Sequence, residues 1–310
     1  MKHNQIKPPI LITAGSTYLD IDAYACAVAL AELLRLKGES AIAYSTATAN
    51  YSVTSSLADD SRLLHILPLD FREQEASYII VDVSDPDYIK DSVPLDRVVA
   101  IYDHHVGFEE YWASRIGNGA HIEFIGAAAT LIYREWKREG LQQQMSPATA
   151  RLLVAAILDN TLNLTSSNTT EEDREAFNEL CRTAGVGSEF RALYFSEVQK
   201  SVEADLKNAL LGDLKTLRDT TVLPPKIAQL CVWDAHGILA HLPDIRVWLG
   251  GSGAWMLNLI SLQEGCSYFL CDDTQYQKNI ETVFDVRFEN GVAGSCVSYL
   301  RKQIIKKAYF

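Results

Sequence analysis

The sequence lacks the features that mark membrane proteins, secreted proteins and general nucleic-acid-binding proteins. Its richest apolar stretch, AYACAVALAELLRL from Ala23, contains Glu32 and is shorter than the roughly 20 residues that a bilayer requires. The amino terminus shows no long apolar core followed by a small-residue cleavage site, so no secretory signal is expected. The net charge of −12 provides no basic footprint for a phosphate backbone. We therefore expect a cytoplasmic protein that binds neither membranes nor duplex nucleic acid.

The cysteines lack the paired spacing of a zinc knuckle or a disulfide framework. This scattered arrangement, with no CxxC pair, indicates reduced thiols and agrees with a cytoplasmic protein. The six cysteines are Cys26, Cys181, Cys231, Cys266, Cys271 and Cys296.

Acidic residues are absent after Glu289, and cations gather in the carboxyl-terminal segment RKQIIKKAYF. The charge run alone is typical of a solvated helix face or a disordered basic end, and a role in binding anions stays open. Its cationic side chains are Arg301, Lys302, Lys306 and Lys307.

Length and apolar content predict two globular domains. A chain of 310 residues with 48% hydrophobic residues can fill two cores of ordinary size. Short apolar segments without strict alternation predict a parallel sheet covered on both faces, over residues 8–15, 40–45, 76–85 and 96–105. Helical spacing predicts helices over residues 22–37 and 126–140, and from Ser146 and about Glu171 onward. The amino-terminal half is therefore expected to be an α/β domain.

A second, smaller α+β domain is expected after a glycine-rich linker. The linker is TAGVGSEF at residues 183–190. Beyond it, strands are predicted over residues 226–234, 253–261, 266–273 and 282–288. We place the domains at residues 1–187 and 188–310.

Carboxylates and imidazoles follow the ends of several predicted strands. In open α/β sheets, ligands bind beyond the carboxyl ends of the strands. Oxygen and imidazole ligands suit Mn²⁺, Mg²⁺ or Co²⁺, and no thiolate lies in these segments to favour a softer ion. The sequence therefore predicts a divalent-metal site. Its candidate residues are Asp20 and Asp22 after the first strand, Asp82 after the third, Asp103, His104 and His105 after the fourth, and Asp159 at the end of a helix.

The order of these segments resembles the DHH phosphoesterase superfamily over nearly the whole chain. GSTYLDIDAYACAVA, IIVDVSD, IYDHH and GAAATLIYREW with LLVAAILDNT look like its four motifs. The second half, with LLGDLKTL and SCVSYLRKQII, is similar to the branch with a DHHA2-type second domain. That branch contains family II inorganic pyrophosphatases, exopolyphosphatases and prune-like proteins.

The resemblance implies two divalent metal ions, Mg²⁺ or Mn²⁺, that activate a water for attack on phosphorus. Asp82 and His105 are implied as catalytic residues, with His105 facing the leaving phosphate oxygen. The implied metal ligands are Asp20, Asp22, Asp82, His104 and Asp159. The implied substrate-binding cations are Lys215, Arg301 and Lys302, with Lys207, Lys306 and Lys307 as rivals. The implied partner is a small phosphate-rich anion or polyphosphate, and a homo-oligomer stays open.

One departure from the pyrophosphatase pattern concerns the first metal position. Ser16 stands where pyrophosphatases have histidine and where the exopolyphosphatase and prune group has asparagine. Loss of an imidazole shifts preference toward Mg²⁺. We therefore expect an exopolyphosphatase-like phosphohydrolase that cleaves phosphoanhydride bonds. Two alternatives are a phosphodiesterase of short oligonucleotides or nucleotide messengers, for which Trp233, Trp248 or Trp255 could stack a base, and a regulatory relative with an eroded site.

Overall fold

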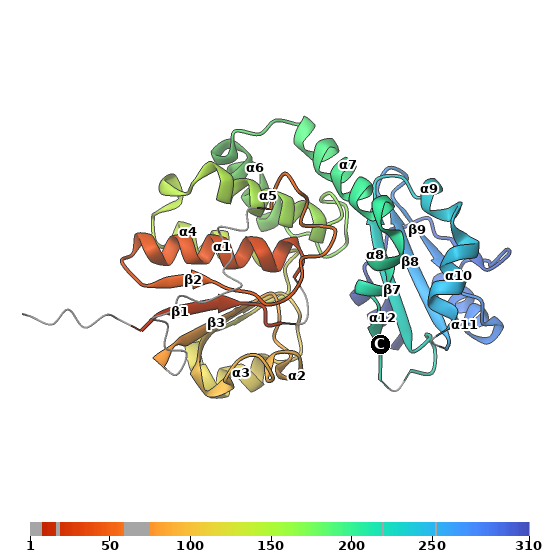
Figure 1. Ribbon diagram of the computed structural model, residues 1–310, viewed down its shortest axis with the longest axis horizontal. Coiled ribbons are helices and arrows are strands. Elements are labelled where there is room, and N and C mark those ends of the chain that lie inside the picture. The colour runs from red at the N-terminus through yellow and green to blue at the C-terminus, as the bar shows by residue number, and fades with distance from the viewer. Residues whose placement is uncertain (1–7, 17–18, 59–74, 219, 252, 310) are drawn as a thin grey trace, which may run out of the picture. The chain divides into compact units, whose positions relative to one another are not determined.

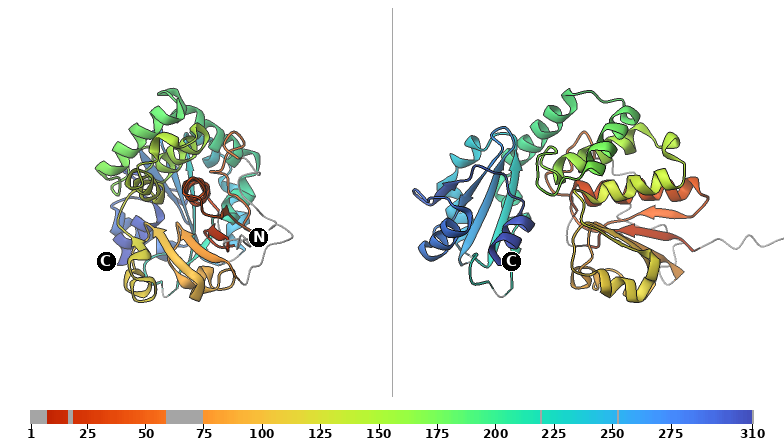
Figure 2. Two further views of the ribbon diagram at one scale, coloured as in Figure 1. Left: turned by 90° about the vertical axis from the view of Figure 1, so that its left-hand side faces the viewer. Right: turned by 180° about the vertical axis from the view of Figure 1, so that it is seen from behind.

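The computed structural model describes residues 8–16, 19–58, 75–218, 220–251 and 253–309. The chain divides into two compact units, and the boundary along the sequence lies between Arg191 and Ala192 (Figures 1 and 2). The predicted functional division at residues 187 and 188 stays a prediction. Within the described residues, no helix has the length and apolar character needed to cross a membrane.

The first unit contains a five-stranded parallel sheet in the order β2-β1-β3-β4-β5. The strands are β1 (Ile10–Thr13), β2 (Ala41–Ala43), β3 (Ser77–Val81), β4 (Val98–Asp103) and β5 (Ala120–Ile122). The near-continuous burial of β1, β3 and the second half of β4 explains why the predicted segments lack alternation. The predicted α/β class with a parallel sheet is confirmed. The short edge strand β5 was not predicted.

Helices cover both faces of this sheet (Figure 1). On one side lie α1 (Ile21–Leu36) and α4 (Ala128–Arg138), with α5 (Pro147–Asn160) packed on α1 and α6 (Glu171–Ala184) packed on α5. On the other side lie α2 (Pro86–Ile89) and α3 (Glu109–Ile116). Buried Trp112 of α3 joins the core beneath β3 and β4. Short 3₁₀ turns occur at Leu95–Arg97, Gly117–Gly119 and Gln142–Gln144.

The cap of α6 also holds the start of α4 in place. Asp173 is fully buried and forms a capping box with Thr170. The same carboxylate accepts hydrogen bonds from the backbone N–H of Gly126 at 3.0 Å and from the Thr130 hydroxyl at 2.6 Å. A Cβ on Gly126 would lie 2.5 Å from Oδ2 of Asp173, so only glycine fits this approach.

Replacing Asp173 with alanine is expected to destabilise the protein by about 3 kcal/mol, because several buried donors lose their acceptor. The free energy of unfolding in urea measures this loss. Glu172→Ala is the matched control from the same turn. It breaks a half-exposed ion pair with Arg134 and should cost less than about 1 kcal/mol. Equal losses in the two variants would contradict the anchoring role of Asp173.

The second unit contains a mixed five-stranded sheet in the order β10-β9-β8-β7-β6. Its strands are β6 (Lys215–Thr216), β7 (Lys226–Val232), β8 (Trp255–Ser261), β9 (Cys266–Leu270) and β10 (Val292–Gly294). Only β7 and β8 pair in parallel. The predicted α+β character of this half is confirmed.

The helices of the second unit share their cores with the sheet. Ile280 and Phe284 of α11 (Thr274–Phe284) and Ile304 of α12 (Arg301–Tyr309) pack with buried residues of β7, β8 and β9. The remaining helices are α7 (Glu189–Ala204), α8 (Leu206–Gly212), α9 (His236–Leu239) and α10 (Leu242–Gly250).

The strand predicted over residues 282–288 is wrong, because α11 extends to Phe284. Asp273 caps this helix by accepting from the backbone N–H groups of Gln275 and Tyr276. Tyr276, Ile280 and Phe284 are spaced four residues apart, which is helical spacing. The apolar alternation that suggested a strand begins at Phe284, the last residue of the helix, and continues in the loop after it.

Candidate metal centre

The strand order of the first unit switches at strands that lead into polar residues singled out in the sequence. From β1 the chain passes to β2 on one side, and β3 pairs with β1 on the other side. Such a switch opens a crevice at the carboxyl ends of the two central strands. Asp20 and Asp22 follow β1, and Asp82 follows β3. The fold therefore directs these carboxylates to the place where α/β proteins bind ligands.

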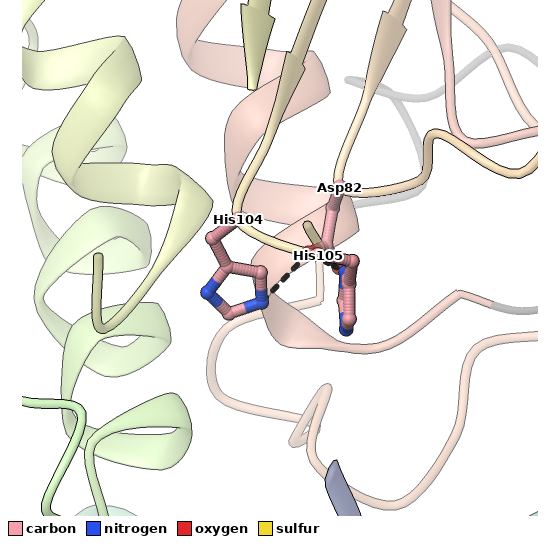
Figure 3. A group of neighbouring side chains, drawn as sticks. All are labelled: Asp82, His104 and His105. Atoms are coloured by element: carbon pink, nitrogen blue, oxygen red, sulfur yellow. Dashed lines mark ion pairs between the residues drawn. The ribbon is translucent and has the colours of Figure 1, made fainter. Parts of the chain in front are cut away.

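Three side chains form a cluster there (Figure 3). Asp82, His104 and His105 offer ligand atoms that lie within 4.8 Å of one another. Nε2 of His104 is 3.4 Å from Oδ1 of Asp82, and Nδ1 of His105 is 4.0 Å from the same oxygen. The side chains of His104 and Asp82 are 0% and 5% exposed, whereas the side chain of His105 is 49% exposed. The cluster is thus closed on one side and open on the side of His105.

The tautomer of His104 follows from its second contact. Its Nδ1 lies 2.9 Å from the carbonyl oxygen of Gly126, which can only accept, so Nδ1 carries the proton. In a neutral ring, Nε2 then presents a lone pair toward the Asp82 carboxylate. Two electron pairs at this distance attract each other only through a shared proton or cation. A backbone carbonyl behind the ring is also the usual support of a metal-binding histidine.

Asp103 orients His105. Its Oδ1 accepts from the backbone N–H of His104 at 2.7 Å, and from the backbone N–H and Nδ1 of His105 at 3.1 and 2.8 Å. Asp103 is fully buried, and its Oδ2 has no hydrogen-bond partner among the described residues. With Nδ1 donating to Asp103, Nε2 of the half-exposed ring of His105 remains for a ligand.

The backbone at Asp82 is held in an uncommon conformation. Its φ is 58°, in the left-handed region that residues other than glycine seldom adopt. The Asp82 N–H donates to the carbonyl of Tyr102 at 2.8 Å, which ties the end of β3 to β4. Strain of this kind costs on the order of 1–3 kcal/mol and persists where the surroundings impose it, often at functional sites.

Asp20 and Asp22 play different structural parts at the start of α1. Asp20 is the N-cap and accepts from the backbone N–H of Ala23 at 2.9 Å. Asp22 is fully buried, and its two oxygens accept from the backbone N–H groups of Ala128 and Ala129 at 2.9 and 2.8 Å. Burial, and next the charge of Asp20, raise the pKa of Asp22 to about 8.

Cys26 lies next to these carboxylates but does not soften the site. Its Sγ is 3.4 Å from Oδ1 of Asp22. Burial, followed by the charges of Asp22 and Asp82, raises the pKa of the Cys26 thiol well above its ordinary value. Because a protonated thiol is a poor metal ligand, oxygen and imidazole atoms remain the donors.

The other residues predicted for the site lie after β1 or at the end of α5. Asp159 is half-buried in the last turn of α5, as predicted. Its carboxylate and those of Asp20 and Asp22 are not part of the cluster of mutually close ligand atoms. Ser16 is exposed and follows Gly15, whose φ of 87° turns the chain after β1. Their roles as metal ligands stay predictions.

The cations predicted to bind substrate belong to the second unit. Lys215 lies half-buried in β6, and Lys302 lies half-buried in α12. Arg301 is buried, and its guanidinium donates to the carboxylate of Asp213 at 2.6 and 3.2 Å, and to the carbonyls of Asp213 and Ile227 at 2.8 and 3.2 Å. This geometry gives Arg301 a structural part, and its role in substrate binding stays a prediction.

Two residues that position the site were given no positioning role from the sequence. Asp103 orients His105, and Gly126 supports His104 through its carbonyl. The sequence pointed to Asp103 as a site residue because it directly precedes the two histidines. It gave no such indication for Gly126, since the contact of Gly126 with His104 spans 22 residues of sequence.

Replacing Asp103 with asparagine is expected to lower kcat by about 10- to 100-fold, the usual effect of removing a residue that orients a ligand. The amide is isosteric but no longer offers a charged acceptor to His105. Steady-state rates should show the loss in kcat with KM little changed. An unchanged kcat would contradict the positioning role.

Comparison with known proteins supports the resemblance. No family model matches the chain. A protein of Staphylococcus carnosus that carries the name of a manganese-dependent inorganic pyrophosphatase is 28% identical over 251 residues, which cover 74% of this chain and 76% of the relative. A protein of the same name from Exiguobacterium is 25% identical over 302 residues, or 91% of this chain and 92% of the relative.

Solved structures agree with the two-unit fold. A Methanococcus jannaschii protein assigned as a family II inorganic pyrophosphatase superposes with a TM-score of 0.70 at 20% identity, over 96% of this chain and 98% of its own. These likenesses support the resemblance of this chain to the DHH phosphoesterase superfamily. An exopolyphosphatase-related protein from Bacteroides fragilis has the same fold, with a TM-score of 0.51, 13% identity and coverage of 98% and 91% of the two chains. The DHH motif itself is Asp103, His104 and His105.

Proposed function

We infer that this protein is a divalent-metal-dependent phosphohydrolase that cleaves phosphoanhydride bonds, as in pyrophosphate or polyphosphate. The observation that carries this function is the pair of facing electron donors, Nε2 of His104 and Oδ1 of Asp82, at the sheet crevice. The names of the relatives, which are manganese-dependent inorganic pyrophosphatases, support the reaction class.

The donor set fits hard or borderline divalent ions. The cluster offers carboxylate oxygen and imidazole nitrogen, and the nearby Cys26 stays protonated. We propose that two divalent ions would be held by Asp20, Asp22, Asp82, His104 and Asp159. When bound, Mg²⁺ or Mn²⁺ supplies an activated water and neutralises phosphate oxygens.

Two histidines and two lysines are proposed to act on the substrate or to shape the site. His104 is held by the Gly126 carbonyl, so its ring stays fixed while substrate enters. We propose that the exposed His105, oriented by Asp103 through Nδ1, donates a hydrogen bond from Nε2 of its imidazolium form to the phosphate oxygen that leaves. Lys215 and Lys302 are proposed to bind the anionic substrate by charge.

Chain length and metal preference are the finer part of the proposal. Ser16 offers a hydroxyl where pyrophosphatases have an imidazole, which favours Mg²⁺ and an exopolyphosphatase-like substrate range. Two of the three tryptophans give the phosphodiesterase alternative no support, because Trp255 is buried and Trp233 stacks on Phe195.

The direct test is phosphate release by the purified protein from pyrophosphate, tripolyphosphate and long polyphosphate, each with Mg²⁺ and with Mn²⁺, and a dinucleotide in parallel. Release from the phosphoanhydrides supports the proposed function, and release from the longer chains with Mg²⁺ supports the role given to Ser16. Cleavage of the dinucleotide alone, or of no substrate, would contradict it.

Metal binding is expected to depend on pH through Asp22. Its folded pKa of about 8 lies above its ordinary value of 3.8, so the metal-free protein is stabilised by the proton below about pH 4 and loses that contribution as pH rises through 8. A divalent ion must displace this proton. Its apparent affinity should therefore rise about tenfold per unit from pH 6 to 8 and then level off. Calorimetric titration with Mn²⁺ measures the slope.

The control for this prediction is Asp22→Asn. The amide has no proton to release, so the rise in affinity between pH 6 and 8 should flatten. An equally steep rise in the variant would show that another group sets the pH dependence.

A further inference from the structure

Two cysteines of the second unit lie at the same end of a β ladder, Cys266 at the start of β9 and Cys296 two residues after β10. Strands β9 and β10 pair antiparallel with Gly294 opposite Tyr268. The pairing runs one residue further, because the Ser295 N–H donates to the carbonyl of Ser267 at 2.8 Å. If the same register continues one residue further, Cys296 falls opposite Cys266, at the start of the bend over Cys296 and Val297.

The register also decides which kind of pair this is. Gly291 and Cys271 share a hydrogen bond, as do Ser295 and Ser267, so these are hydrogen-bonded positions. Antiparallel ladders alternate, which makes Cys296 and Cys266 a non-hydrogen-bonded pair with Cα atoms about 4.5 Å apart when regular. That spacing falls within the roughly 4.4–6.8 Å that a disulfide spans.

Both thiols are reachable from solvent, unlike the other cysteines of this unit. Cys296 is exposed and Cys266 is partly exposed, whereas Cys231 and Cys271 are buried. The two sulfurs are also close enough to interact electrostatically. Burial is the main cause that raises the pKa of Cys266, and the charge of Glu264 is the next. The charge of Cys296 raises this pKa further.

We propose that Cys266 and Cys296 form a reversible disulfide, a redox modification site that the proposed hydrolase function does not use. A low-molecular-weight disulfide such as oxidised glutathione supplies the oxidant. The exposed thiolate of Cys296 attacks it, forming a mixed disulfide and releasing one thiol. The thiolate of Cys266 then attacks the Cys296 sulfur, forming the protein disulfide and releasing the second thiol.

The bridge acts on the segment that leads from β10 into α12. At Cys296 and Val297 the chain bends, with the Val297 N–H bound to the Ser295 hydroxyl at 3.1 Å, and the Tyr299 N–H reaches the Ser267 hydroxyl at 2.9 Å. A covalent link from Cys296 to β9 fixes this connection at its first residue. Oxidation therefore restrains the start of α12, where Lys302 lies.

The test is a peptide map of the full-length folded protein after equilibration in glutathione buffers of increasing oxidised fraction, followed by alkylation and trypsin digestion. We expect residues 247–278 to become linked to residues 288–301, and dithiothreitol to release them. Because the first peptide also contains Cys271, the variants Cys266→Ser and Cys271→Ala are compared. The link should vanish in Cys266→Ser and persist in Cys271→Ala.

Absence of the link in the oxidised wild-type protein would overturn the proposal. So would a link that persists in Cys266→Ser, since it would join Cys271 instead. The readout is a covalent mass and needs no enzymatic activity, so its failure is distinct from a failure of the proposed hydrolase function. Cys296→Ser gives the second control, and it should abolish the link without a change in the thermal unfolding midpoint of the reduced protein.

Discussion

Asp82→Asn is expected to lower kcat for pyrophosphate hydrolysis by about 10³-fold, because the charge stabilisation supplied through a bound metal amounts to several kcal/mol. The amide removes the negative charge that faces Nε2 of His104 at 3.4 Å. Asparagine is the sharpest replacement, since it tolerates the left-handed backbone of this position, φ 58°. Steady-state kinetics and the metal content of the purified variant measure the effect.

Asp85→Asn is the matched control for this variant. Asp85 lies in the same loop and caps α2 by accepting from the Asp87 N–H at 2.9 Å. Asparagine caps a helix about as well as aspartate. Asp85→Asn should therefore keep both kcat and metal content. An Asp82→Asn protein with full metal-dependent activity would remove Asp82 from the site.

Arg301→Met is expected to reduce the free energy of unfolding by about 3–5 kcal/mol, because it leaves the buried carboxylate of Asp213 without its cation. The pair is nearly inaccessible, with 10% and 4% of the two side chains exposed. The loss is measured by urea unfolding. Lys302→Met, one residue along the same helix, should change the stability by less than about 1 kcal/mol.

A second variant separates a structural part from a substrate-binding part for Arg301. Replacing both partners, as Arg301→Met with Asp213→Leu, removes the unpaired charge and should recover most of the lost stability. If Arg301 instead binds substrate, Arg301→Met would leave stability unchanged and raise KM for pyrophosphate at least tenfold, and the double variant would not rescue it.

The parallel sheet and its polar strand ends could be predicted from the sequence because both follow from local patterns. One short apolar run ends at Asp82, and another ends at Asp103 and two histidines. Such a run predicts a buried strand, and the polar residue after it marks where the strand ends. The order of strands in an α/β sheet then brings their carboxyl ends to one edge. The location of the site can therefore be predicted without knowing many contacts between residues distant in the sequence.

Features that rest on contacts between distant residues could not be predicted. The pairing of Arg301 with Asp213 joins residues 88 apart, and the hydrogen bonds from Ala128 and Ala129 to Asp22 span more than 100 residues. The same holds for the support of His104 by Gly126. The segment 282–288 shows the local limit, since alternating apolar residues began inside a helix whose cap, Asp273, lies well upstream.

The pyrophosphatase rate of chelator-treated protein against added Mn²⁺ tests the central claim most directly, with His104→Ala assayed in parallel. The proposed site predicts no phosphate release without the ion, a saturable return of activity in the wild-type protein, and almost none in the variant. Metal-independent release by the wild-type protein, or equal reactivation of His104→Ala, would contradict it.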